Sequence, residues 1–231
     1  MPSADAPPVV LVHGWAGSFE STWQRSGFTA LLDDAGRQVI GVDLLGHGTA
    51  PKPHDPHAYA DLTTRITDAL PDQPVDAIGF SLGALTLLRL ATQFPQRLRR
   101  LVLAGVGRNA FDADEEQGQR MIAAVEGTAD EADTAARAFA NYAHEPGNDP
   151  QALAAVLRAG GRRLTPAEVA TVTCPTLVVI GEHDFAGPAD VLADALPNGT
   201  LQVLRNVDHF ATPEAFGFID AALEFIGAVP A

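Results

Sequence analysis

The chain has 231 residues, of which 46% are hydrophobic and 19% are charged, an ordinary balance for a globular protein. Its formal net charge of −14 argues against nucleic acid and anionic membranes as partners. Charged, glycine or proline residues interrupt every apolar run before it could span a bilayer. Because Cys174 is the only cysteine and no basic leader opens the chain, we expect a cytoplasmic protein without disulfides.

Six short apolar runs predict the strands of a parallel sheet. These runs are Val9–Val12, Val39–Asp43, Ala77–Phe80, Leu101–Ala104, Thr176–Ile180 and Leu201–Leu204. Each run is continuous rather than alternating, which is typical of strands that are covered on both faces. Helical patterns, such as those over residues 59–69, 82–94 and 216–226, separate the runs. The alternation predicts an α/β protein with a doubly wound, mostly parallel six-stranded sheet.

One long stretch, residues 108–174, breaks this alternation. It contains no predicted strand but several amphipathic helical pieces, and a structureless loop of this length is improbable. We therefore expect a helical cap over the carboxyl ends of the strands, with residues 1–107 and 175–231 forming the core. Four side chains of the cap are expected to contact substrate, although helix packing alone would also account for them: Phe111, Met121, Phe139 and Tyr142.

The first chemical signal is the stretch GFSLGA, in which a predicted strand passes directly into a predicted helix and leaves Ser81 at the corner. Glycines at positions 79 and 83 avoid Cβ clashes at such a turn. The hydroxyl of Ser81 would then project into the crevice at the strand ends. A plain capping serine would explain the motif alone, but its strand–turn–helix context favours a catalytic nucleophile.

A nucleophilic serine needs a base and an acid that orients the base. His209 follows the last predicted strand, and Asp184 follows the fifth, so both are expected at the same edge of the sheet as Ser81. Asp208 is the second choice for the acid, because a sequence neighbour of His209 cannot easily face its ring nitrogen. A zinc site of His183, Asp184 and His209 fits no familiar ligand spacing, so we expect no metal and no cofactor.

Acyl transfer also needs two hydrogen-bond donors for the oxyanion of the intermediate. The first candidate is the backbone N–H of Leu82, in the first turn of the helix after Ser81. The stretch VVLVHGWAGS supplies the second, because Gly14 permits a tight turn that would direct the N–H of Trp15 into the crevice. The Trp15 indole is expected at the edge of the pocket, and His13 is expected to brace the loop.

Together, the segments HGWAG, DLLGHG, GFSLGA, CPTLVVIGEHD and VDHF resemble the α/β-hydrolase superfamily, in the order of that family and over nearly the whole chain. The resemblance implies Ser81 as the nucleophile, Asp184 as the acid and His209 as the base. It implies that the amides of Trp15 and Leu82 form the oxyanion hole.

The resemblance also extends to structural positions. It implies a structural loop at Asp43, Gly46 and Gly48 and a packing position at Cys174. The first predicted strand lies close to the amino terminus, so we expect a minimal form of this fold that lacks the usual amino-terminal hairpin.

The expected activity is that of a serine hydrolase for carboxylic esters of small to medium size, acting through an acyl-enzyme on a small molecule. A lactonase or a carbon–carbon bond hydrolase with the same triad is one alternative. A ligand-binding protein without catalytic activity is another, because this fold also serves such roles. The sequence does not distinguish a monomer from a dimer.

Overall fold

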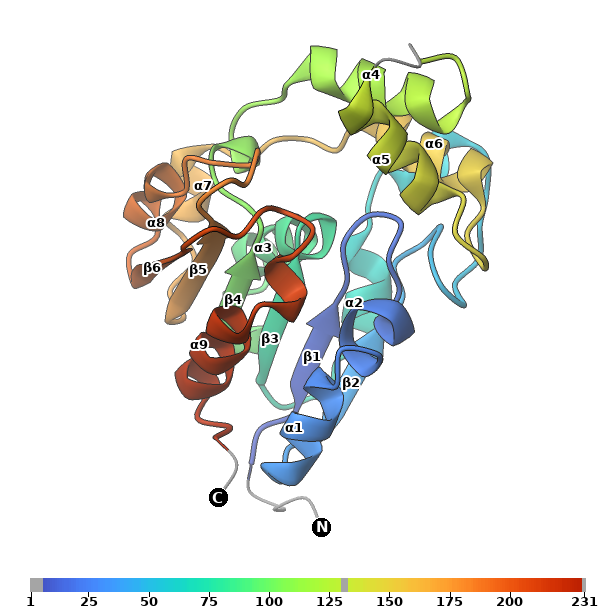
Figure 1. Cartoon of the computed structure of the whole chain (residues 1–231). Coiled ribbons are helices and arrows are strands. Elements are labelled where there is room, and N and C mark those ends of the chain that lie inside the picture. Colours follow the sequence, from blue (N-terminus) through green and yellow to red (C-terminus); the bar gives the residue numbers. More distant parts are fainter. Residues whose placement is uncertain (1–5, 130–132, 230–231) are drawn as a thin grey trace.

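The computed structural model of the chain describes residues 6–129 and 133–229 (Figure 1). Within these residues, six strands form one parallel sheet in the order β2-β1-β3-β4-β5-β6. They are β1 (Val9–Val12), β2 (Val39–Val42), β3 (Val75–Phe80), β4 (Leu98–Ala104), β5 (Thr176–Gly181) and β6 (Gly199–Leu204). The predicted fold class and all six predicted strands are confirmed. Residues 1–5, 130–132 and 230–231 of the predicted core and cap lie outside the described residues.

The strand order reverses between β1 and β3, because the chain runs from β1 to β2 on one side and then to β3 on the other. In open α/β sheets, ligands bind outside the carboxyl ends of the strands at such a reversal. In the register of these two strands, Val12 lies opposite Gly79. The loop that begins at His13 and the strand–helix corner at Ser81 therefore leave the sheet side by side.

Helices cover both faces of the sheet (Figure 1). One face packs against α2 (Thr63–Ala69), α3 (Leu82–Gln93) and α8 (Asp190–Ala195), and the other against α1 (Phe28–Asp34) and α9 (Phe216–Ile226). The second face has an aromatic centre of Trp23, Phe28 and Phe218, with ring centroids 5.3 to 6.2 Å apart. Among the described residues, no helix combines the length and the hydropathy needed to cross a membrane.

The described part of the stretch between β4 and β5 contains four α-helices joined by loops and no strand: α4 (Glu115–Val125), α5 (Thr134–Ala143), α6 (Pro150–Ala159) and α7 (Pro166–Val169). In Figure 1, α4, α5 and α6 lie over the carboxyl ends of the strands. By contrast, α7 packs against α3 and α8, and Val169 belongs to the main core. Short helical turns complete the fold: η1 (Glu20–Gln24), η2 (Pro56–Tyr59), η3 (Pro95–Arg97), η4 (Arg108–Ala110) and η5 (Thr212–Glu214).

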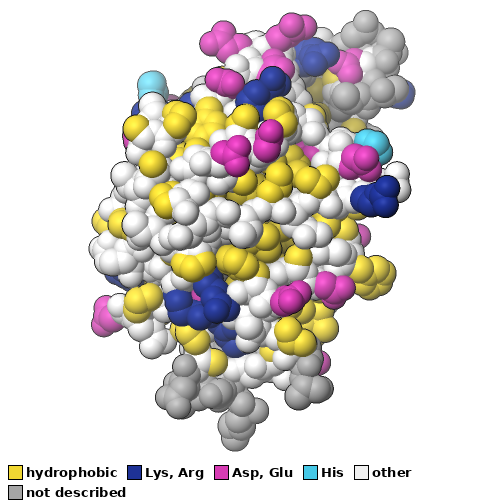
Figure 2. Space-filling view, turned by 90° about the vertical axis from the view of Figure 1, so that its left-hand side faces the viewer, with side chains coloured by type: hydrophobic (Ala, Val, Ile, Leu, Met, Phe, Trp, Pro, Cys, Tyr) yellow, Lys and Arg dark blue, Asp and Glu magenta, His cyan; other side chains and the backbone are white. Residues whose placement is uncertain are grey.

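The edge strand β6 departs from the prediction that every strand is buried on both faces. Leu201 and Val203 are 39% and 48% exposed. Figure 2 faces this side of the molecule and shows hydrophobic side chains reaching the surface. The prediction is wrong here because β6 has a neighbouring strand on one side only, and an apolar run does not reveal which strand will stand at the edge.

A buried charge cluster lies near the amino end of the sheet, at the start of β3. The carboxylate of Asp76 is fully buried and accepts hydrogen bonds from the guanidinium groups of Arg37 and Arg99. Arg37 also donates to the carbonyl oxygens of Pro7 and Ile226. Because an unpaired buried charge is strongly unfavourable, the two arginines are what allow a carboxylate at this position in the core.

Candidate active site

Ser81 stands where β3 passes directly into α3, and its backbone has φ 50° and ψ −113°. Positive φ is unfavourable for a residue with a side chain, so the surrounding structure must impose this conformation. A Cβ on Gly79 would lie 2.7 Å from the nitrogen of Ala84 in α3, so the missing side chain clears the turn as predicted. A Cβ on Gly83 would instead overlap the carbonyl oxygen of His13, so this glycine admits the neighbouring strand β1.

The structure brings together the three residues predicted to form a triad. Nε2 of His209 lies 3.0 Å from Oγ of Ser81. Nδ1 of His209 lies 2.8 and 2.9 Å from the two carboxylate oxygens of Asp184, which also accepts a hydrogen bond from the N–H of Ala186. His209 is 5% exposed and the Asp184 side chain is fully buried, so the bond between the imidazole and the carboxylate is shielded from bulk water, whereas Ser81 lines a cavity.

The second candidate for the acid, Asp208, occupies a different position. Its carboxylate belongs to an exposed residue and accepts a hydrogen bond from the N–H of Ala211. His183 is exposed as well. Across the described part of the chain, no group of three or more His, Cys, Asp or Glu side chains could hold a metal ion. The hydroxyl, imidazole and carboxylate gathered at Ser81 are connected by hydrogen bonds, and this arrangement suits nucleophilic chemistry by a serine hydroxyl.

Three aromatic rings surround His209. The ring centroids of Phe80, Phe185 and Phe210 lie 5.0, 4.3 and 5.6 Å from that of the imidazole. Phe185 and Phe210 are nearly half exposed, so they separate the imidazole from solvent. Sequence reasoning missed these two residues, although each directly follows a predicted triad residue in the chain. Their packing restricts the imidazole to the orientation that contacts Ser81.

The loop after β1 lies against the nucleophile. A Cβ on Gly14 would lie 2.8 Å from the ring of Phe80 and 3.4 Å from Cβ of Ser81, so only glycine allows this approach. Trp15 and Leu82, whose backbone amides are the predicted oxyanion donors, both line the cavity at Ser81. Leu82 is the first residue of α3, so its N–H has no acceptor within the helix.

His13 connects the loops that follow β1 and β2. Its Nε2 accepts a hydrogen bond from the N–H of Leu44 at 3.1 Å, and its Nδ1 therefore donates to the carbonyl of Gly14 at 2.7 Å. This pattern requires a neutral ring, and burial lowers the pKa of His13 below its ordinary value. Burial, followed by the proximity of His13, lowers the pKa of the neighbouring His47 to about 3. The predicted bracing role of His13 agrees with these contacts.

The loop after β2 is organised by Asp43. Its carboxylate accepts hydrogen bonds from the N–H of Phe19 at 2.7 Å and from the N–H of Thr49 at 2.8 Å. Gly46 and Gly48 have φ of 86° and 49°, and a Cβ on Gly48 would overlap the carboxylate of Asp43. These contacts support the structural role that the family resemblance implies for this loop.

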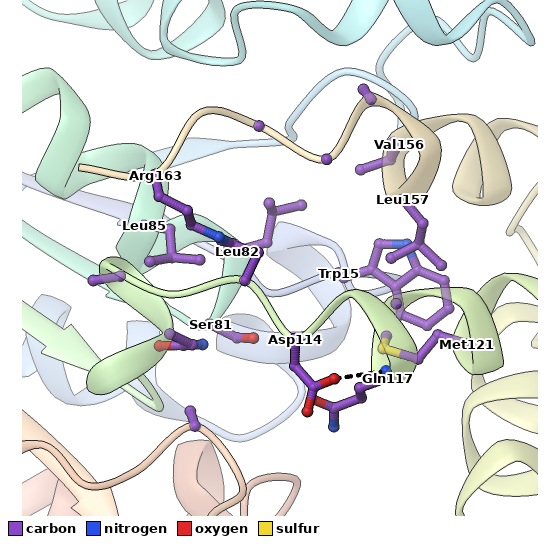
Figure 3. A pocket seen from close by; sticks show the side chains of 18 of the residues that line it. Trp15, Ser81, Leu82, Leu85, Asp114, Gln117, Met121, Val156, Leu157 and Arg163 are labelled. Carbon is purple, nitrogen blue, oxygen red and sulfur yellow. Dashed lines mark hydrogen bonds between the residues drawn. The ribbon is translucent and has the colours of Figure 1, made fainter. Parts of the chain in front are cut away.

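A cavity of about 1290 Å³ extends from Ser81 between α3 and the helices above the sheet (Figure 3). Ser81 and one face of α3 form part of its wall, and the residues of that face are Leu82, Leu85, Thr86 and Arg89. Much of the apolar remainder comes from Trp15, Tyr59, Met121, Ile122, Val156 and Leu157. The volume is sufficient for a small or medium-sized organic molecule beside the serine hydroxyl.

Trp15 links the loop after β1 to the helices above it. Its indole Nε1 donates a hydrogen bond to the carbonyl of Leu153 in α6 at 3.2 Å. Its ring packs edge to face with Phe139 of α5, with centroids 6.0 Å apart. One residue thus belongs both to the loop beside Ser81 and to the packing of the helical region.

The four predicted cap contacts lie in three different places. Met121 lines the cavity. Phe139 and Tyr142 pack against Phe210, with ring centroids 5.4 and 6.2 Å apart. Phe111 packs against the main hydrophobic core. A role of these side chains in binding substrate stays a prediction.

Sequence reasoning did not identify the arginines of the cavity wall. Five of them line it: Arg89, Arg108, Arg158, Arg162 and Arg163. For three of them, the available signal was the segment RAGGRRL, which runs from the end of α6 into the loop before α7. Loop arginines are usually solvated, so the segment alone does not indicate a binding site.

Comparison with known proteins adds an independent finding. The family model described as alpha/beta hydrolase fold matches residues 7–149. A 2-hydroxy-6-oxo-2,4-heptadienoate hydrolase from Pseudomonas putida is 36% identical over 109 residues, which cover 46% of this chain and 39% of the relative. A pimeloyl-[acyl-carrier protein] methyl ester esterase from Neisseria meningitidis is 38% identical over 123 residues, which cover 51% and 36%. The chain thus spans less than half the length of these relatives.

Solved structures resemble the whole chain. A hydrolase from Pseudomonas aeruginosa PA01 has a TM-score of 0.73 and 25% identity, over 98% of this chain and 92% of that structure. The enol-lactonase from Burkholderia xenovorans LB400 has a TM-score of 0.72 and 22% identity, over 97% and 92%. At that level of identity, the second likeness concerns the fold alone.

Proposed function

The chain belongs to the alpha/beta hydrolase fold family, and from this premise we propose that it is a serine hydrolase for carboxylic esters of small to medium size. The observation that carries the proposal is the position of His209, 3.0 Å from the Ser81 hydroxyl and 2.8 Å from the Asp184 carboxylate. An acyl-transfer enzyme needs a nucleophile, a base and an orienting acid connected in this order.

In the first half of the reaction, Nε2 of His209 takes the proton of Ser81 while Oγ attacks the ester carbonyl carbon. The carboxylate of Asp184 stabilises the imidazolium that forms. The carbonyl oxygen becomes an oxyanion and accepts hydrogen bonds from the backbone N–H groups of Trp15 and Leu82. His209 then protonates the leaving alkoxide, and an acyl-enzyme remains on Ser81.

In the second half, a water molecule loses a proton to His209 and attacks the acyl-enzyme carbonyl. The second intermediate collapses, Ser81 recovers its proton from His209, and the carboxylic acid leaves. Phe185 and Phe210 keep bulk water away from one side of the imidazole. The reaction requires neither a metal nor an organic cofactor.

In this proposal residues 108–174 act as a cap, and the cavity that Met121 and Trp15 line receives the substrate. Phe111, Phe139 and Tyr142 are secondary candidates, which would influence the shape of this cavity. The similarity to an enzyme named as a methyl ester esterase supports an ester as the substrate. A cytoplasmic location, and a small molecule as the only partner, stay predictions from the sequence.

A lactonase or carbon–carbon bond hydrolase with the same triad is the second candidate. The similarity to a 2-hydroxy-6-oxo-2,4-heptadienoate hydrolase, an enzyme named for a keto acid rather than for an ester, favours it. Such an enzyme would use the same proton transfers at His209 but would turn over esters poorly.

The test combines fluorophosphonate labelling with turnover of p-nitrophenyl esters of increasing chain length, beside panels of lactones and diketones. We expect the wild type to be labelled and to hydrolyse esters. In Ser81→Ala we expect labelling to vanish and turnover to fall by about 10⁶-fold, because the nucleophile is lost. Ser26→Ala, which removes a hydroxyl outside the site, is the matched control. Preferred turnover of lactones or diketones would favour the second candidate, and neither labelling nor turnover would favour a binding protein.

A further inference from the structure

Most charged side chains of the cavity wall are grouped by sign, with Arg108, near Asp112, and Arg158, paired with Glu126, as the exceptions. Most carboxylates lie at the start of α4, in Asp112, Asp114 and Glu115, with Glu126 just after its end. Most arginines lie on α3 and between α6 and α7. A molecule in the cavity therefore meets an acidic region on one side and a basic region on the other.

Some of the arginines already have carboxylate partners. Arg158 pairs with Glu126, and Arg162 pairs with Glu168 at 2.6 Å. In contrast, Arg89 and Arg163 have no carboxylate oxygen within 4.0 Å among the described residues. Among the described residues, Arg89 donates a hydrogen bond to the carbonyl oxygen of Arg162. The two guanidinium groups are thus neighbouring positive charges without a close counter-charge, although Asp61 and Glu168 act on Arg89 from farther away.

Arg163 is placed to meet a ligand. Figure 3 shows its side chain extending from the loop after α6 towards Leu82 and Leu85, while Trp15 and Met121 lie at the other end of the view. Its Nε is buried and has no hydrogen-bond partner among the described residues. Burial, followed by the charge of Arg89, lowers the pKa of the Arg163 guanidinium. Since arginine stays protonated in proteins, an anion beside it would compensate an unfavourable charge.

The spacing along α3 indicates the shape of such a ligand. Arg89 follows Ser81 by two helical turns, which places its Cα about 12 Å farther along the axis at 1.5 Å per residue. Between them, Leu82 and Leu85 present apolar side chains to the cavity. A molecule that reaches from the serine to the arginines therefore has a reactive end, an apolar middle and a charged end.

We propose that Arg163 and Arg89 form a carboxylate-binding subsite, and that the substrates of the Ser81 centre are esters with a free carboxylate at the end remote from the scissile bond. The proposal rests on the proposed esterase function. A guanidinium group offers parallel N–H donors that match the two oxygens of a carboxylate. Because the net charge of −14 repels anions in general, such a substrate needs a local positive site.

The test compares matched ester pairs. In the first pair the probe is a mono-p-nitrophenyl ester of a dicarboxylic acid, and its partner has the free carboxylate capped as a methyl ester. In the second pair the carboxylate lies on the alcohol part instead. We expect the wild type to prefer the anionic member of at least one pair in kcat/KM. Arg163→Met should lower that preference by about 10- to 100-fold, the range expected for a shielded charged hydrogen bond.

Arg25→Met is the matched control, because it removes an exposed arginine that pairs with Glu20 and does not line the cavity. Its preference should stay within about threefold of the wild type, as expected for an exposed ion pair. Arg163→Lys should retain part of the preference, and Arg163→Gln replaces Arg163→Met if the latter does not fold. Equal turnover of both members in both pairs, or a preference that survives the loss of Arg163, overturns the subsite while leaving the esterase intact. A wild type that is neither labelled nor active on any ester overturns the proposed function as well.

Discussion

Two regions of the site are constrained in different ways. Around Ser81, the backbone conformation restricts which residues can be present, whereas in the cavity under α4 and α6 the side chains determine the shape and charge of the wall. At the corner, a positive φ at Ser81 and two close backbone approaches at Gly79 and Gly83 leave almost no choice of residue. In the cavity, Met121 and Arg163 stand on ordinary helix and loop backbone that other residues could adopt. The comparison teaches that the chemistry can stay constant while the choice of substrate changes, because the two depend on different parts of the chain.

The largest expected effect is on catalysis and concerns the acid of the triad. Asp184→Asn should lower kcat/KM by up to about 10⁴-fold, because the imidazole loses its orienting carboxylate. Asp208→Asn, next to His209 in the chain but with its carboxylate bonded to the N–H of Ala211, should have little effect on turnover. Steady-state kinetics on one p-nitrophenyl ester measure both variants. If Asp208→Asn were the more damaging change, the acid would be assigned wrongly.

The next effect concerns the backbone of the corner. Gly83→Ala should lower the free energy of unfolding by about 2–3 kcal/mol, since its Cβ would overlap the carbonyl oxygens at the end of β1. Gly118→Ala in α4, where a Cβ meets no atom within 4 Å, should instead raise it by about 0.5–1 kcal/mol. Urea denaturation measures both. Equal changes in the free energy of unfolding for the two substitutions would contradict the claim that the backbone is more constrained at the corner than in α4.

A smaller effect is expected from the buried histidines behind the corner. The pKa of His47 is about 3 in the folded protein against an ordinary 6.5, so the unfolded chain binds an extra proton between these values. The contribution of neutral His47 to the free energy of unfolding is therefore fully present above pH 6.5. It is lost as the pH falls, by up to about 1.4 kcal/mol per pH unit.

His47→Gln should flatten this dependence, and His57→Gln, at an exposed position, should not. Urea denaturation at several pH values between 6.5 and about 5 measures the slope, in a range where few carboxylates titrate. A slope that His47→Gln leaves unchanged would mean that the protonation lies elsewhere.

The smallest effect lies where the two regions meet. Trp15→Phe keeps an aromatic ring but removes the Nε1 hydrogen bond to Leu153, which should lower stability by about 1 kcal/mol. Because the bond joins the loop beside Ser81 to α6, the dependence of kcat/KM on acyl chain length should also change. Thermal denaturation and a chain-length series measure the two effects. A stable variant with an unaltered series would show that the two regions are independent.

The predictable parts of the molecule are those that backbone geometry dictates. The strand–helix corner at Ser81 requires glycines, which are visible in the sequence. Asp184 and His209 could be predicted because each follows the carboxyl end of a predicted strand. The exposure of Leu201 depends on which strand stands at the edge, which a local run does not encode. Likewise, the helical spacing of Phe139 is the same for a residue of the core and for a residue that lines a pocket, so the sequence does not distinguish these two positions. Arg163 became informative only when folding placed it beside Arg89.

The cluster at Asp76 has a consequence for how the chain folds. Its partners span nearly the whole sequence, from Pro7 through Arg37 and Arg99 to Ile226. Contacts between such distant residues form slowly, because large loops must close first. Burying the carboxylate before the arginines arrive is unfavourable, so premature collapse around β3 is disfavoured. One charged group at the start of β3, at the end opposite Ser81, thus makes the arrival of Arg37 before β2 and of Arg99 in β4 a condition for burying the start of this strand.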